Sequence, residues 1–268
     1  MLAEATRRDS FPGLARPRAA VTILLAPDQR RFREWVGPYA PEWGAAIAFP
    51  EQQRIVMQGS TAGSDAGDPR TVLRHELAHL ALYEAMGDLP PRWFDEGYAS
   101  YAAGEWGRDE MLATNLALFL RRMPSLDQLD DGFHGGSSAA EASYALSHRA
   151  VAELAALDPQ RGLSLFFRYW RESRRLDPAV RAAYGITLSS FEELWQRNTR
   201  RRFGALALIG DLTLVALFTV VVTVPLYISR RRRYRRRVEA MLAAEAELER
   251  QQRESAIEEL LRSVGEGK

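Results

Sequence analysis

Apolar and polar positions follow two different periods in the first two hundred residues of the chain. Three short apolar runs, each bounded by turn-forming residues, are typical of strands: 20–25, 45–49 and 54–57. Pro27-Asp28 opens a helix over 29–36. From residue 69 to about 200 the apolar positions recur at helical spacing, and a loop at 130–138 interrupts them. The pattern predicts an α+β fold, with a small N-terminal β-sheet packed on a helix and a mainly helical C-terminal part.

The clearest helix lies between Asp68 and Gly87. Asp68 is a good N-cap, Pro69 suits the first helical position, and Gly87 suits the position just after the helix. Pro90-Pro91 then breaks the chain, and 92–104 has the pattern of a second helix that can cross the first. The apolar positions of the first helix are spaced by three or four residues: Val72, Leu73, Leu77, Leu80 and Met86.

Residues 204–228 form a continuous apolar block of 25 residues in which Asp211 is the only charge. A helix of this length rises about 37 Å, which spans a hydrocarbon core of ~30 Å. A buried core helix is the alternative, but here apolar residues surround the whole circumference. We therefore expect a single transmembrane helix that separates a domain at 1–203 from a tail at 229–268.

Arginines flank this block unequally. Seven follow it at 230–233 and 235–237, and four precede it at 197 and 200–202. This bias favours a cytoplasmic tail and an extracytoplasmic 1–203 domain. Such a domain needs an export signal, and the sequence offers no convincing one, so we expect one upstream of residue 1; the alternative is a domain that faces the cytoplasm.

The tail carries apolar residues at helical spacing over 238–264, within a predicted partner-binding segment at 235–264. Such a helix can pair with another helix or lie on the anionic inner leaflet, and a solvated helix is the simpler alternative. The bilayer itself is the partner expected for 204–228.

Composition and charge exclude several classes of site and partner. The net charge is +1, so no global field points to nucleic acid, and we expect no such partner. The chain contains no cysteine, which rules out disulfides, zinc–thiolate sites and thiol nucleophiles.

The chemistry concentrates in His75-Glu76-Leu77-Ala78-His79, on the first of the two helices. Imidazoles four residues apart project from the same helix face, about one turn from each other, and can bind one metal ion. Glu76 is rotated by roughly 100° from His75, near the ion but not aimed at it. That offset suits a base that takes a proton from a zinc-bound water.

Two imidazoles leave a catalytic zinc short of a third protein ligand. Glu96, on the second helix, is the obvious candidate, because sixteen residues after His79 allow a turn and a return. His134 and His148 are the other candidates but lie farther along the chain. Two ordinary surface histidines are the plainer interpretation, but an HExxH sequence arises by chance only about once in a few hundred chains of this composition.

The same residues resemble a known group. His75-Glu76-Leu77-Ala78-His79 followed by Pro91-Arg92-Trp93-Phe94-Asp95-Glu96-Gly97-Tyr98-Ala99 is similar to the gluzincin metallopeptidases, specifically the peptidase MA-like domain family. The resemblance extends upstream over 42–56 and fades after about residue 175. It implies one Zn²⁺ ion held by His75, His79 and Glu96, with Glu76 as general base.

Two departures from that pattern concern function. Ser100 stands where the thermolysin-like branch has an aspartate that orients a zinc histidine, so we expect Asp95 or Glu105 to take this part. The Gly-Ala-Met-Glu-Asn sequence of related aminopeptidases is also missing, and with it an anchor for a free substrate amine.

Peptide hydrolysis also needs a donor for the developing oxyanion. Tyr144 and His148 lie four residues apart on one helix face, and the resembled family has a tyrosine in a comparable context. We favour Tyr144 over His148 for this role, with a core tyrosine as the alternative.

The sequence thus predicts a membrane-anchored zinc metallopeptidase that acts on peptides or proteins. The Gly-rich and Ser-rich stretch at 59–67 is expected to form a rim of the substrate cleft. The alternative function is a membrane-tethered binding or scaffold protein that keeps the zinc fold with weak turnover or none.

Overall fold

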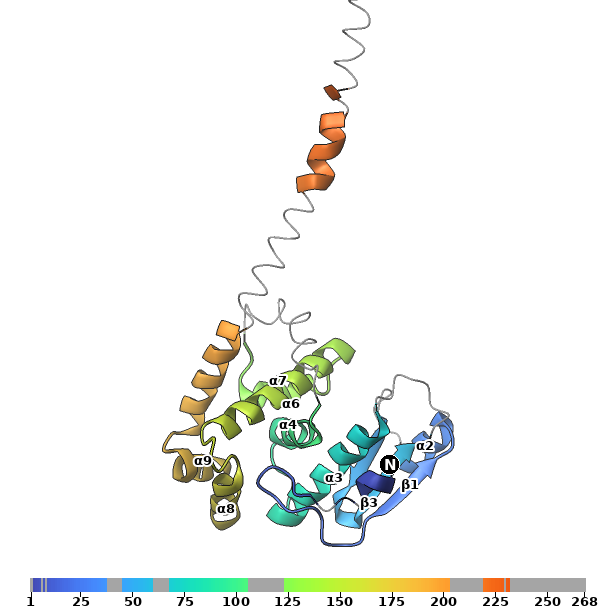
Figure 1. Cartoon of the computed structure of the whole chain (residues 1–268), viewed down its shortest axis with the longest axis vertical. Coiled ribbons are helices and arrows are strands. Elements are labelled where there is room, and N and C mark those ends of the chain that lie inside the picture. Colours follow the sequence, from blue (N-terminus) through green and yellow to red (C-terminus); the bar gives the residue numbers. More distant parts are fainter. Residues whose placement is uncertain are drawn as a thin grey trace, which may run out of the picture. The chain divides into compact units, whose positions relative to one another are not determined.

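A computed structural model of the chain describes residues 2–5, 7, 9–37, 45–59, 68–105, 123–202, 219–228 and 230–231 (Figure 1). It divides into two compact units, Met1–Ala207 and Leu208–Lys268. The first contains a small sheet and a body of helices, so the expected α+β class is confirmed for this unit.

The sheet has three strands in the order β1-β3-β2: β1 (Thr22–Ala26), β2 (Ala46–Phe49) and β3 (Arg54–Gln58). All three were expected from the apolar runs. β1 pairs with β3 in parallel, and β2 pairs with β3 antiparallel. Between β2 and β3 the chain forms a short 3₁₀ helix, η1 (Pro50–Gln52).

Alternate residues of β3 pack on opposite faces of the sheet, as the two-residue period of a strand requires. Val56 packs with Phe32 of α2 (Gln29–Val36) on one face. Ile55 and Met57 join the main core on the other face, which α3 (Pro69–Met86) covers. The helix α3, which carries His75 and His79 and is called the zinc-motif helix below, is therefore held between the sheet and the helical body (Figure 1).

α3 begins and ends where its sequence predicts. The Asp68 side chain accepts a hydrogen bond from the backbone N–H of Thr71, and Pro69 occupies the first turn. Gly87 adopts a left-handed conformation with φ of 73°, and its N–H donates to the carbonyl of Tyr83 at 2.7 Å. These caps fix which turns of the helix carry His75 and His79.

The helical body surrounds α4 (Arg92–Ala103). Trp93, Phe94 and Tyr98 of α4 are buried, and Phe94 packs on the rings of Phe166 and Phe167. The loop expected at 130–138 is shorter than predicted, because α6 extends to Gly132 and α7 begins at Ser137. The other helices are α6 (Leu126–Gly132), α7 (Ser137–Ala156), α8 (Ser164–Ser173), α9 (Leu176–Tyr184) and a helix over 188–202.

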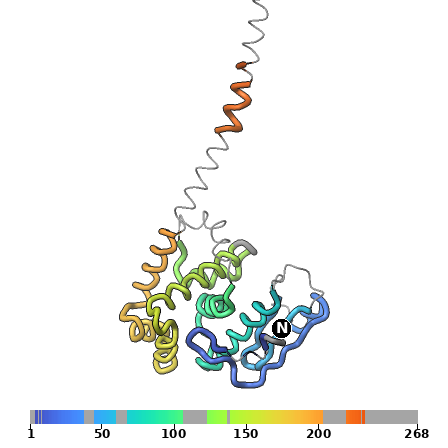
Figure 2. Tube along the Cα trace, viewed as in Figure 1, coloured from blue at the N-terminus to red at the C-terminus, as the bar shows by residue number. Residues whose placement is uncertain are grey.

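The N-terminal segment is part of this body and includes the short helix α1 (Leu2–Ala5). Phe11 and Leu14 are buried in the main core, and the Tyr98 hydroxyl donates to the carbonyl of Pro12 at 3.1 Å. Gly13 packs so closely that an added Cβ would lie 2.9 Å from the backbone of Leu163. The chain thus crosses the helical body before it reaches the sheet (Figure 2).

The second unit is described only at 219–228 and 230–231, which are helical. Val220, Val221 and Leu226 are exposed there. Within the described residues, no helix combines the length and apolar character that crossing a bilayer requires. The predicted span at 204–228 lies mostly outside them, as does most of the 229–268 tail, and both stay predictions.

Candidate metal centre

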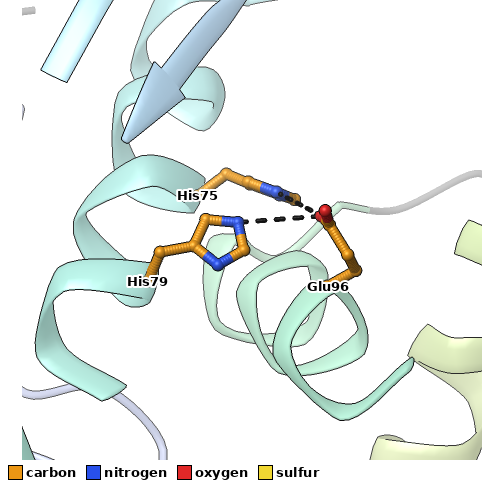
Figure 3. Close-up of side chains that lie close together, drawn as sticks. All are labelled: His75, His79 and Glu96. Atoms are coloured by element: carbon orange, nitrogen blue, oxygen red, sulfur yellow. Dashed lines mark ion pairs between the residues drawn. The ribbon is translucent and has the colours of Figure 1, made fainter. Parts of the chain in front are cut away.

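α3 places His75 and His79 one turn apart on the face that α4 crosses. Their ring centroids are 4.9 Å apart, with planes inclined by 69°. Nε2 of His75 lies 3.5 Å from Oε2 of Glu96, and Nε2 of His79 lies 3.7 Å from the same oxygen (Figure 3). Three side chains predicted from the sequence as ligands therefore converge on one point.

Glu96 reaches this point because α4 is fixed at its start and near its middle. Pro91 offers no side-chain cap, and Asp130 of α6 accepts hydrogen bonds from the backbone N–H groups of Arg92 and Trp93, at 3.2 and 2.6 Å. One residue after Glu96, Gly97 lies against α7, where an added Cβ would be 2.4 Å from the carbonyl oxygen of Ser147. Only glycine allows α4 and α7 to approach so closely.

The geometry fits a zinc ion. The ligand atoms of His75, His79 and Glu96 all lie within 4.8 Å of one another. A tetrahedral zinc with bonds near 2.05 Å places its ligand atoms roughly 3.3 Å apart, close to the 3.5 and 3.7 Å seen here. Two imidazoles and one carboxylate form a set that leaves one position open for water or substrate, which distinguishes catalytic from structural zinc sites.

Both histidines are oriented by a second carboxylate. Nδ1 of His75 lies 2.9 Å from Oε1 of Glu105, and Nδ1 of His79 lies 2.7 Å from Oδ1 of Asp95. A carboxylate only accepts, so each Nδ1 carries a proton, and once Nε2 loses its own proton its lone pair is left for a metal ion beside Glu96. The two acids expected as substitutes for the missing aspartate are thus both in place. Ser100 is buried, and its hydroxyl makes no hydrogen bond within the described residues.

Glu76 lies beside the cluster and is only 7% exposed. Burial raises the pKa of its carboxyl, while the neighbouring imidazoles and a hydrogen bond from the backbone N–H of Ala48 act in the opposite direction. The backbone N–H of Gln58 donates to the carbonyl of Ala45. Along an antiparallel strand, every second residue is hydrogen-bonded to the partner strand, so Ala48 directs its backbone groups away from β3 and its N–H can reach Glu76. A carboxylate with a raised pKa is a better proton acceptor.

The other candidates lie around this centre. Tyr144 is half-buried on α7, and its ring packs 4.9 Å from that of Phe133. His148 lies 6.1 Å, ring to ring, from Tyr101, and His134 lies near Arg92 rather than within the metal cluster. The oxyanion role of Tyr144 or His148 stays a prediction, and residues 60–67 of the expected cleft rim lie outside the described residues.

Sequence reasoning missed Asp130 and Arg92. Asp130 was placed in a loop, and no local pattern indicates that its carboxylate caps a helix 37 residues earlier. Arg92 lies four residues before Glu96, a spacing that indicates an ion pair on one helix face, and its Nε lies 3.7 Å from Oε1 of Glu96.

Comparison with known proteins identifies one family. The family model described as the Peptidase MA superfamily matches residues 13–200, which cover the sheet, the zinc-motif helix, α4 and the helical body. No curated protein and no solved structure matches the chain.

Removing either orienting carboxylate should weaken metal binding. Asp95→Asn and Glu105→Gln each leave a histidine without its anionic partner, and we expect zinc affinity to fall by about 10–100-fold. Ser100→Ala is the matched control, because its hydroxyl orients nothing, and its affinity should stay within about twofold of wild type. Chelator competition measures all three; equal losses in all of them would contradict this assignment.

Zinc affinity should rise with pH. In the metal-free protein, burial lowers the pKa of both histidines, but hydrogen bonds and charges from the surrounding acids raise it more, to about 10 for His75 and about 9 for His79. Both rings are then protonated at neutral pH, and a metal must displace these protons. Between about pH 6 and pH 8, affinity should increase by up to roughly a hundredfold per pH unit. Calorimetry in buffers of different ionisation enthalpy measures the protons released; an affinity independent of pH would refute the coupling.

Proposed function

The chain belongs to the Peptidase MA superfamily, and on that premise we propose that it is a zinc metallopeptidase acting on peptides or proteins. The observation that carries the proposal is the cluster of His75, His79 and Glu96 with the buried carboxylate of Glu76 beside it. Three protein ligands leave a position open for water, and an adjacent base suits hydrolysis by that water.

Bound at this cluster, zinc would supply Lewis-acid chemistry, acidifying a water molecule and polarising the scissile carbonyl. Glu76 would accept the proton of the attacking water and deliver it to the leaving amine. Its burial favours the first step, since a carboxyl with a raised pKa takes up the proton more readily than an exposed one.

Tyr144 is the proposed donor to the developing oxyanion. Its ring packs on Phe133, the guanidinium of Arg92 lies over the same Phe133 ring at 5.0 Å, and Arg92 is paired with Glu96. The proposal is supported by this chain of contacts, which links the tyrosine through Phe133 and Arg92 to the carboxylate ligand. A phenolic O–H directed to this region would stabilise negative charge during attack.

A peptide backbone can be recognised by β2. In the described part of the sheet β2 is an edge strand, and its alternate backbone groups face away from β3. Ala48 already directs its N–H to Glu76, so this edge adjoins the proposed base. An extended substrate paired beside β2 would bring its backbone to the catalytic carboxylate.

The peptidase domain is proposed to be held at a membrane by residues 204–228, with the tail cytoplasmic. The support is the uninterrupted apolar sequence and the seven arginines that follow it. Protease added to intact cells should digest the 1–203 domain and spare the tail. A domain that is shielded until the cells are lysed would contradict this orientation.

Replacing the base should abolish turnover but leave the metal bound. Glu76→Gln keeps the shape of the side chain and removes proton transfer, so we expect kcat to fall by about 10²–10⁴-fold with zinc content unchanged. Glu84→Gln is the matched control, an exposed glutamate on the same helix that contacts only the backbone of Arg18 among the described residues.

Cleavage of a fluorogenic peptide library, with zinc measured by mass spectrometry, gives both readouts. Equal cleavage by wild type and Glu76→Gln would refute the mechanism. Zinc binding without cleavage in either protein would instead favour the binding or scaffold function.

A further inference from the structure

The two oxygens of Glu96 face different partners. Oε2 is the oxygen near both histidines, at 3.5 and 3.7 Å from their Nε2 atoms. Oε1 is the oxygen that pairs with Arg92, whose Nε lies 3.7 Å from it. The carboxylate is therefore divided between the metal cluster and a permanent cation.

Arg92 is held in this position by groups outside its own helix. Its guanidinium carbon lies 5.0 Å from the centroid of the Phe133 ring, and its Nη1 lies 3.5 Å from Nε2 of His134. Its backbone N–H donates to Asp130 at 3.2 Å. All three partners belong to α6 or the turn that follows it, so the guanidinium is located by packing as well as by its pair with Glu96. An ordinary exposed ion pair with i,i+4 spacing lacks such support.

We propose that Arg92 is a positioning residue that makes Glu96 a one-oxygen ligand. A carboxylate can bind a metal through one oxygen or through both. Binding through both would occupy the position that a catalytic zinc keeps open. The cation at Oε1 competes with the metal for that oxygen, so Oε2 alone is left for coordination. This role rests on the part of the proposed function that assigns a metal to this site.

The alternative is a solvated ion pair, since the Arg92 side chain is 39% exposed. Such a pair contributes little to helix stability and leaves the metal unaffected. The two interpretations differ in the coordination number of the metal when the cation is removed.

Cobalt(II) substitution in the full-length protein separates them, because the intensity of cobalt d–d absorption falls as coordination number rises. We expect Arg92→Ala to bind one cobalt per chain with a weaker d–d band, as a second carboxylate oxygen coordinates. In the zinc form, kcat should fall by roughly 10-fold or more with KM changed by less than about twofold. Arg92→Lys keeps a cation at i,i+4 spacing and should restore the wild-type spectrum.

Arg181→Ala is the matched control. It removes an exposed i,i+4 pair with Asp177 on α9, 3.1 Å between Nη2 and Oδ2, and should change neither spectrum nor kcat. An Arg92→Ala spectrum identical to that of wild type would overturn the role of Arg92. So would an Arg92→Lys protein that matches Arg92→Ala, or an Arg92→Ala protein that binds no cobalt.

The spectrum also keeps this inference apart from the proposed function. Suppose that wild type binds cobalt and that Arg92→Ala changes the cobalt spectrum, but that the zinc form of wild type cleaves no peptide. This result would support the role of Arg92 in coordination and refute the peptidase function. Wild type that binds no cobalt would overturn both.

Discussion

The metal centre depends on how buried negative charge is balanced where α4 crosses α3. Asp95, Glu96 and Glu105 contact the two histidines, and unpaired charge at such a place is costly. Arg92 offsets one of the three carboxylates. In the metal-free protein the other two are balanced by protons on His75 and His79, which explains why the pKa of each ring is raised despite burial.

A divalent cation carries the same charge as those two protons. Zinc can therefore replace them without changing the total charge of the cluster. When zinc replaces the Nε2 protons, Glu105 and Asp95 can keep their hydrogen bonds to Nδ1 and so orient the neutral rings. One arrangement of acids thus serves both the metal-free and the metal-bound protein.

Much of this arrangement follows from local sequence. The caps at Asp68 and Gly87 set the turns of α3, the i,i+4 spacing sets the two imidazoles, and Pro90-Pro91 sets the break before α4. The strands could be predicted from their apolar runs because both faces of the sheet are covered. In β3, Val56 packs in one apolar cluster, and Ile55 and Met57 pack in the other.

The interactions that sequence reasoning could not predict join residues far apart in the chain. Asp130 caps α4 from another helix, and Gly97 matters only because α7 lies against it. Arg74, next to His75, pairs with Glu4 and Asp9, so the N-terminal segment also anchors the zinc-motif helix. The sequence indicated Asp95 or Glu105 as the acid that orients a zinc histidine. Only the path of α4 shows that Glu105 contacts His75 and Asp95 contacts His79. The predicted membrane span rests on composition alone.

The most direct test of the account is zinc X-ray absorption on the full-length protein as purified, together with its metal content. We predict one zinc per chain, bound by two imidazole nitrogens, one carboxylate oxygen and one solvent oxygen at about 2.0–2.1 Å. A protein that retains no zinc after reconstitution would contradict it. So would a zinc whose imidazole scattering survives when His75 and His79 are both replaced by alanine.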